Sequence, residues 1–173
     1  MIILPCHDIT PSFGNDTYVA ENATIIGDVQ IGSECSIWFQ AVIRGDVHSI
    51  RIGNKTNIQD GAILHCTYKK ASLKIGNEVS IGHGAIVHGC TVEDRVLIGM
   101  GARVLDHAFI ASDVIIAAGA LVLENFQTEP GYLYAGVPAK KIKPLSPEQI
   151  EGLQKTAQQY VMYSQWGILT KIS

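Results

Sequence analysis

The chain has 173 residues, of which 47% are hydrophobic, and this suits a single domain with a substantial core. Its 13 basic and 16 acidic side chains give a formal net charge of −3. No strong field of one sign therefore favours nucleic acid or an anionic membrane as a partner, and we expect the protein to bind neither.

The N-terminal segment and the cysteines bear on the cellular compartment. The start MIILPCHD lacks the cationic region and long apolar run of a signal peptide, and no later stretch approaches the roughly 20 apolar residues that cross a bilayer. The four cysteines, Cys6, Cys35, Cys66 and Cys90, match no CxxC metal or redox motif. We therefore predict a soluble cytoplasmic protein with free thiols.

The central part of the chain repeats with a period of six residues. A large apolar residue recurs at this spacing, and four positions later a small, hydroxyl or β-branched residue usually follows, such as Ala23, Ala41 or Val47. Extra residues interrupt the spacing after Ile43 and after Leu64. The repeated apolar positions are Val19, Ile25, Ile31, Ile37, Ile43, Ile52, Ile58, Leu64, Ile75, Ile81, Val87, Val92, Ile98, Val104, Ile110, Ile116 and Val122.

Such a repeat describes a short strand followed by a corner, and three strands would close one triangular coil. The inward residues of successive coils then stack into an apolar column that no single coil could bury alone. We therefore predict a parallel β-helix over residues 1–143, including an N-terminal lead-in, with the extra residues forming loops at its corners.

A helix is predicted after the last repeat. The segment GYLYAGVPAKKIKPL is punctuated by Gly and Pro and should leave the β-helix. Ser146, Pro147 and Gln149 then match an N-cap, a first helical residue and a capping-box partner, and apolar residues follow at helical spacing. We expect residues 144–173 to form a C-terminal helix that packs on the β-helix within the same domain. Tyr160 on this helix is a candidate catalytic residue.

Two histidines occupy equivalent positions in the repeat. His65 and His88 each directly follow a repeated apolar residue, and they are three repeats apart, so they should stack one coil apart on the same face. Neighbouring strands lie roughly 4.8 Å apart, a separation from which two imidazoles can bind one ion. The same column holds Arg44 one coil earlier and Leu105 one coil later. His65 and His88 are therefore predicted to be two ligands of one metal site.

A third histidine falls on a different part of the coil. His83 lies two residues after a repeated apolar position, near a corner, with Asp60 one coil before it. An ion held by His65 and His88 should therefore receive His83 from another subunit, and a homotrimer with three shared sites would provide it. Three neutral imidazoles with an open fourth position are typical of catalytic zinc, which lowers the pKa of bound water to about 7.

Four motifs carry a resemblance to a known family. RGDVHSIRIGNKTNIQDGAILH, IGHGAIVHGC, VLIGMGA and GYLYAGVPAKKI resemble the gamma-class carbonic anhydrase-like family of hexapeptide-repeat proteins, and the resemblance covers nearly the whole chain. It implies a left-handed parallel β-helix and the reversible hydration of carbon dioxide by a metal-bound hydroxide. The pKa of about 7 for zinc-bound water is itself a value from carbonic anhydrase.

In the family, two of the three metal ligands come from one subunit and the third comes from its neighbour. The resemblance also implies roles for individual residues. The implied roles are metal ligands at His65, His83 and His88, an orienting pair at Gln59 and Asn57 beside the metal, an interface-bracing pair at Arg44 and Asp46, and an interface and network residue at Asp60. The ion is expected to be Zn²⁺, although imidazoles also accept Fe²⁺, Co²⁺ and Ni²⁺.

The chain departs from the family at the position of its proton shuttle. The family's best-studied form has glutamates on an acidic loop, whereas the insert CTYKKASLKIG is basic and has no carboxylate. No second acid follows Asp46, where the sequence is VHSI. Fast hydration would then require another proton path through His48, through Tyr160 or through buffer.

Two other functions stay open on the sequence. The segment AGVPAKKI also resembles hexapeptide acyltransferases, so acyl transfer or acyl-coenzyme A thioester hydrolysis is an alternative enzyme activity. A non-catalytic metal-binding scaffold is the third possibility. Cys66 and Cys90 lie near His65 and His88 in the repeat and are either soft-metal ligands or, as we predict, ordinary free cysteines.

Overall fold

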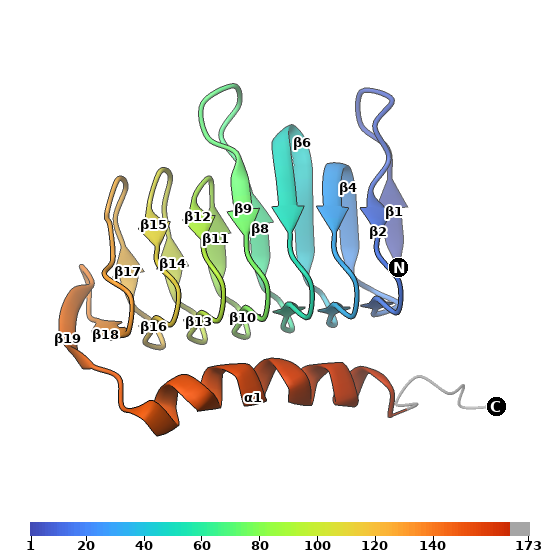
Figure 1. The fold of residues 1–173 in the computed structure, drawn as a ribbon. Helices are drawn as coiled ribbons and strands as arrows, with labels where there is room; N and C mark the ends of the chain where they lie inside the picture. The colour runs from blue at the N-terminus through green and yellow to red at the C-terminus, as the bar shows by residue number, and fades with distance from the viewer. Residues whose placement is uncertain (167–173) are drawn as a thin grey trace.

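The computed structural model describes residues 1–166, and these form the left-handed parallel β-helix and C-terminal helix that the sequence predicts. Short strands separated by corners wind the chain around a triangular core, so the β-helix has three faces (Figure 1). The strands of each face pair in parallel with the equivalent strands of neighbouring coils. The N-terminal segment enters the first coil, and the last coil leads into the helix.

The first and second faces share one eleven-stranded sheet because two long strands, β4 and β6, continue across the edge between them. The strands of the first face are β1 (Ile2–Leu4), the N-terminal parts of β4 (Thr24–Ile31) and β6 (Val42–Ile52), β8 (Ile63–His65), β11 (Ile86–His88), β14 (Arg103–Val104) and β17 (Leu121–Val122). The second face has β2 (Ser12–Phe13), the C-terminal parts of β4 and β6, β9 (Leu73–Ile75), β12 (Thr91–Val92) and β15 (Phe109–Ile110).

The third face is an eight-stranded sheet. Its strands are β3 (Tyr18–Val19), β5 (Ser36–Ile37), β7 (Asn57–Ile58), β10 (Ser80–Ile81), β13 (Leu97–Ile98), β16 (Ile115–Ile116), β18 (Tyr132–Ala135) and β19 (Lys140–Pro144). All of its pairs are parallel except that of β18 with β19, where the chain turns back to leave the β-helix.

The repeat predicts the register of the coils correctly. Ile43, Leu64 and Val87 lie in adjacent coils of the first face, and all three are fully buried. One inward position was predicted wrongly: Val47 is only half-buried, whereas Ile50 is fully buried. The extra residues after Ile43 extend β6 around the edge, and this extension moves the next inward position from 47 to 50.

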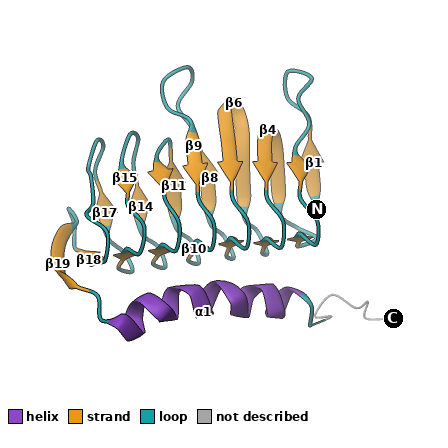
Figure 2. Cartoon of the chain, viewed as in Figure 1, coloured by secondary structure: helices purple, strands orange, loops and turns teal. Residues whose placement is uncertain are grey.

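Helix α1 (Pro147–Ser164) covers the third face (Figure 2). Ser146 and Gln149 form the predicted capping box, in which each side chain receives the backbone N–H of the other residue. The helix contacts β5, β7 and β10 and buries Leu153 and Ala157 against them. Residues 167–173 of the predicted C-terminal segment lie outside the described part of the chain.

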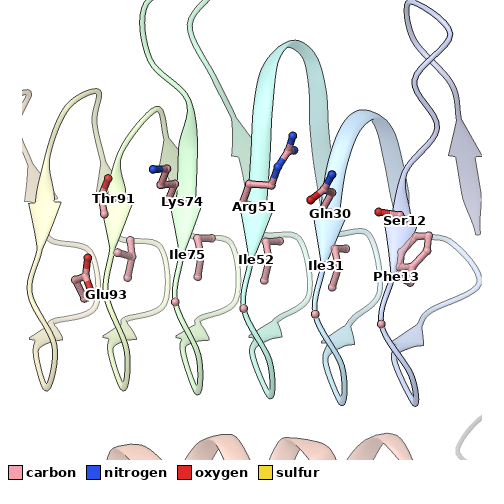
Figure 3. Close-up of a pocket in the computed structure, with 15 residues that line it drawn as sticks. Ser12, Phe13, Gln30, Ile31, Arg51, Ile52, Lys74, Ile75, Thr91 and Glu93 are labelled. Atoms are coloured by element: carbon pink, nitrogen blue, oxygen red, sulfur yellow. The ribbon is translucent and has the colours of Figure 1, made fainter.

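Helix α1 does not cover the second face, which has a shallow groove of about 600 Å³ (Figure 3). A row of polar side chains borders the groove above buried isoleucines; the row consists of Ser12, Gln30, Arg51, Lys74 and Thr91. Glycines form its floor because the coils approach closely there: a Cβ on Gly53 would lie 2.6 Å from the carbonyl carbon of Gly76. Close packing of the coils is therefore sufficient to explain the groove.

All four cysteines are free, as predicted. Within residues 1–166, no helix combines the length and the apolar composition needed to cross a membrane.

Candidate metal centre

Two of the predicted ligands lie side by side on the first face. Strands β8 and β11 end in His65 and His88, and the two residues are partners in the parallel register, as the repeat predicts. The distance from His65 Nδ1 to His88 Nε2 is 3.1 Å, and the ring centroids are 5.1 Å apart. One nitrogen of each imidazole therefore faces the other ring.

The outer nitrogen of each imidazole contacts a carboxylate. His65 Nε2 lies 3.0 Å from Asp46 Oδ1, and His88 Nδ1 lies 2.5 Å from Asp106 Oδ1. A carboxylate accepts a hydrogen bond, so each outer nitrogen is assigned the ring N–H. The inner nitrogens, His65 Nδ1 and His88 Nε2, then carry lone pairs when the rings are neutral.

The inner nitrogens fit a metal ion. Two lone pairs that face each other at 3.1 Å repel unless a cation lies between them. On a tetrahedral Zn²⁺ with bonds of 2.0–2.1 Å, two nitrogens are roughly 3.3 Å apart, close to the separation here. The outer carboxylates provide the carboxylate–histidine arrangement that orients metal-binding imidazoles. The donor chemistry of His65 and His88 is therefore that of half a metal site.

The protonation states of this group support the same assignment. Burial lowers the pKa of His65 below its usual value and, together with nearby Arg44, outweighs the opposing hydrogen bond to Asp46. Burial alone would raise the pKa of Asp46, but hydrogen bonds with His65 and Arg44 prevail and hold it below its usual value. Neutral imidazole and ionised carboxylate are the forms that metal binding requires.

Asp106 and Thr67 belong to this group, and the sequence did not predict either. Burial alone would raise the pKa of Asp106, but hydrogen bonds with Thr67 and His88 outweigh it, so the carboxyl pKa is lowered. Asp106 lies one coil beyond Gly89, the residue that follows His88, and a Cβ on Gly89 would lie 2.8 Å from the Asp106 carboxyl carbon. A glycine next to His88, with an acid one coil later, was the signal in the sequence.

His83 lies away from the first two histidines, as predicted. It occupies the corner between the third and first faces, and its Nδ1 is 2.9 Å from Oδ2 of Asp60 in the preceding coil. About half of each side chain is exposed. In one chain, residues 1–166 include no group of three His, Cys, Asp or Glu side chains placed to hold a metal ion. The three predicted ligands therefore form two separate groups.

The predicted orienting residues lie on the same side as His83. Gln59, the neighbour of Asp60, is buried and donates from Nε2 to Asn57 Oδ1 at 3.0 Å. Asn57 in turn donates to Ser80 Oγ at 2.8 Å. The structure groups Asn57 and Gln59 with His83 and not with His65 and His88.

Tyr160 also lies on the side of Asp60. Its ring packs edge-on against Trp38 with centroids 5.7 Å apart. Burial, followed by the negative charge of Asp60, raises the pKa of the Tyr160 hydroxyl above its usual value. A phenol of this kind keeps its proton at neutral pH, and this makes it a poor proton shuttle.

The other predicted residues have clear positions. Arg44 and Asp46 form an ion pair within one chain, while their role at an interface stays a prediction. His48 Nδ1 accepts the backbone N–H of Ser49 at 2.8 Å. Cys66 and Cys90 are buried, and burial raises the pKa of both thiols, that of Cys66 to about 11. Protonated thiols are weak metal ligands, which favours the prediction that both are ordinary cysteines.

Comparison with known proteins adds to the geometry. Residues 10–45 match the family model of the bacterial transferase hexapeptide (six repeats). Protein YrdA of Escherichia coli is 44% identical over 168 residues, which cover 94% of this chain and 91% of that protein. A carbonic anhydrase of Geobacillus kaustophilus is 40% identical over 165 residues, which cover 95% of this chain and 90% of that protein.

A solved structure shows the same fold. The crystal structure of a hexapeptide transferase family protein from Anaplasma phagocytophilum superposes with a TM-score of 0.91 at 39% identity, covering 94% of this chain and 96% of that one. The relatives extend over almost the full length of the chain, and one of them is a carbonic anhydrase. The chain belongs to the gamma-class carbonic anhydrase-like family of hexapeptide-repeat proteins.

Proposed function

We propose that the protein is a metal-dependent carbonic anhydrase-like lyase that hydrates carbon dioxide reversibly at sites shared between the subunits of a homotrimer. The observation that carries this proposal is the pair of imidazole nitrogens of His65 and His88, which face each other at 3.1 Å. Asp46 and Asp106 hold the outer nitrogens of the two rings. This arrangement leaves one ring nitrogen of each histidine free of the carboxylates and close to the other ring.

His83 of a neighbouring subunit completes the ligand set in this proposal. The position of His83 supports this role. It lies at an exposed corner, where Asp60 contacts its Nδ1 and leaves its Nε2 available. Three imidazoles suit Zn²⁺, and Fe²⁺, Co²⁺ or Ni²⁺ are alternatives that depend on availability. When bound, such an ion acts as a Lewis acid and lowers the pKa of coordinated water.

The protein's own side chains position the reacting groups. The hydrogen bond from Gln59 Nε2 to Asn57 Oδ1 fixes the Gln59 amide and leaves Gln59 Oε1 as an acceptor for water or substrate. Because Asn57 and Gln59 lie on the His83 side, they would reach a shared site together with that histidine. In this arrangement one subunit supplies two ligands, and its neighbour supplies the third ligand and the orienting amides.

Proton transfer is expected to limit turnover. The loop after β8 carries no carboxylate, and Tyr160 keeps its proton at neutral pH because its pKa is raised. His48 is the remaining candidate within the chain, and external buffer is the alternative. Hydration should therefore accelerate when imidazole buffer is added.

Stopped-flow measurement of carbon dioxide hydration, on protein of known metal content, tests the proposal. We expect metal-dependent hydration that rises with imidazole concentration and is abolished by His83→Ala. His107→Ala removes an exposed histidine outside the predicted ligand set and should leave the rate unchanged. Stoichiometric metal without hydration at any buffer concentration would contradict the proposal.

The same preparation tests a second candidate function. The relative from Anaplasma phagocytophilum is described as a hexapeptide transferase family protein, and this supports acyl chemistry as the alternative. Hydrolysis of acyl-coenzyme A by protein that does not hydrate carbon dioxide would favour this alternative. If neither reaction occurs and metal is bound, the chain is a metal-binding scaffold.

A further inference from the structure

A pocket of about 420 Å³ lies at the edge between the first and second faces. The loop between β1 and β2 and the loop between β8 and β9 rise above this edge, with the tips of β4 and β6 between them (Figure 1). We call this the edge pocket. The residues that line it include Asp28, Asp46, His48, Arg51 and Lys69.

Both carboxylates of the edge pocket are already engaged by cations or N–H groups. Asp28 Oδ1 lies 2.7 Å from Arg51 Nη1. Asp46 is paired with Arg44 and also accepts from His65 Nε2. Neither carboxylate is therefore left as a free negative charge in the pocket, and an anion can approach its remaining donors.

Lys69 and His48 are two donors of the pocket that an anion could use. Within residues 1–166, Lys69 forms no ion pair, and its Nζ lies 5.0 Å from the centroid of the Tyr68 ring. Because His48 Nδ1 accepts the backbone N–H of Ser49, the ring proton is assigned to Nε2, which becomes a donor. The basic insert of the sequence thus supplies a cation to the pocket, and strand β6 supplies an N–H.

The loop that carries Lys69 is held in place before any ligand binds. Thr67 and Ala71 pair across it through hydrogen bonds of 3.1 and 3.2 Å. The Thr67 hydroxyl also donates to Asp106 Oδ2 at 2.5 Å. A preorganised loop loses little conformational entropy on binding, and this favours a site over a merely charged surface.

We propose that the edge pocket binds a small organic oxyanion, a carboxylate or phosphate ester, between Lys69 and His48. Its volume falls within the roughly 300–1,000 Å³ of small-molecule sites. Ile9, Val47 and Tyr68 provide apolar surface for the organic part of such a ligand. The site requires no metal ion and does not depend on the proposed hydration reaction.

Isothermal titration calorimetry with phenyl phosphate, benzoate and inorganic phosphate tests the proposal on metal-free protein. We expect phenyl phosphate or benzoate to bind more tightly than inorganic phosphate. Whichever of these two organic probes has the higher affinity identifies phosphate or carboxylate as the preferred head group. Lys69→Gln should weaken binding roughly tenfold or more, because it removes a charged hydrogen-bond donor. Lys70→Gln changes the next residue of the same loop, which does not line the edge pocket, and should bind as the wild type does.

Two further measurements locate the ligand. The ring resonances of His48 should shift during the titration, while those of His107 should not. Binding by a His88→Ala variant, which keeps the His65 partner of Asp46, separates this pocket from the metal centre, because an anion held between the two imidazoles would be lost there. The proposal is overturned if no probe binds at millimolar concentration, if Lys69→Gln binds as tightly as wild type, or if His88→Ala does not bind.

Discussion

Asp106 determines which nitrogen of His88 faces His65. The carboxylate lies 2.5 Å from His88 Nδ1 and also accepts from the Thr67 hydroxyl, so two neighbours hold it in one orientation. An imidazole that donates from Nδ1 must present Nε2 as its lone pair. The proposed metal centre therefore depends on a residue that does not itself face the ion.

Asp106→Asn should weaken metal binding by about 10–100-fold, the usual cost of losing an outer partner of a metal-binding histidine. The amide keeps the shape of the carboxylate but removes its charge, and its NH₂ group can turn toward His88. Competition with a coloured chelator measures the affinity. Asp113→Asn alters another paired aspartate, bound to Arg95 on a different edge, and should leave the affinity unchanged. Equal affinities in wild type and Asp106→Asn would exclude this role.

The sequence identified the three histidines but not the carboxylate behind His88. The repeat places His65 and His88 one coil apart because inward positions fix the register, and the structure pairs them in that register. Asp106 follows a different apolar position by two residues, whereas His88 follows its own by one. Whether their side chains meet depends on the corner at Gly89, whose geometry the period of six does not specify.

At the scale of the coil, backbone spacing sets which residues are tolerated. A Cβ added to Gly53 would lie 2.6 and 2.7 Å from the carbonyl carbon and oxygen of Gly76, so the backbone of the next coil would have to move. A Cβ added to Gly152, within α1, would meet no atom within 4 Å. The β-helix and its covering helix therefore impose opposite requirements on glycine.

Gly53→Ala and Gly152→Ala should change stability in opposite directions. Gly53→Ala overpacks two coils and should lower the free energy of unfolding by about 1–3 kcal/mol. Gly152→Ala removes backbone freedom from an open helical position and should raise it by about 0.5–1 kcal/mol. Denaturant unfolding of the two variants beside wild type measures both changes. A loss of stability in Gly152→Ala would mean that the helix packs more tightly against the third face than the structure indicates.

The narrow core also explains how much of the fold could be predicted from the sequence. Alternation of large and small inward residues is enforced in every coil by the narrow core, so the period revealed the strands and their order. The repeat predicted Val47 as the inward residue, but Ile50 takes that position, because β6 continues across an edge as one strand of 11 residues. Extra residues can form either a loop or a longer strand, and their number alone does not distinguish the two.

At the scale of the whole molecule, the three predicted ligands occupy two edges of the same face. His83 precedes β11 at one corner and His88 ends β11 at the other, so a strand of the first face separates them. At about 3.3 Å per residue, this strand is far longer than the roughly 2 Å bond from a nitrogen to a metal ion. A rigid β-helix cannot bring the two corners together, so the proposed three-histidine site would need the edges of two chains.

Mixing two inactive variants tests this arrangement. His83→Ala retains only the paired ligands, and a His65→Ala, His88→Ala double variant retains only His83, so neither assembly alone should bind metal tightly. When equal amounts are unfolded together and refolded, about a quarter of the interfaces in a random cyclic trimer place intact His65 and His88 against an intact His83. We expect tight metal binding at about that fraction of sites, measured by metal analysis after gel filtration, together with the corresponding share of hydration activity. When the two variants are mixed after each has folded and assembled, we expect no tight metal binding until their subunits exchange. If refolded mixtures recover none either, the three histidines do not share one ion across an interface.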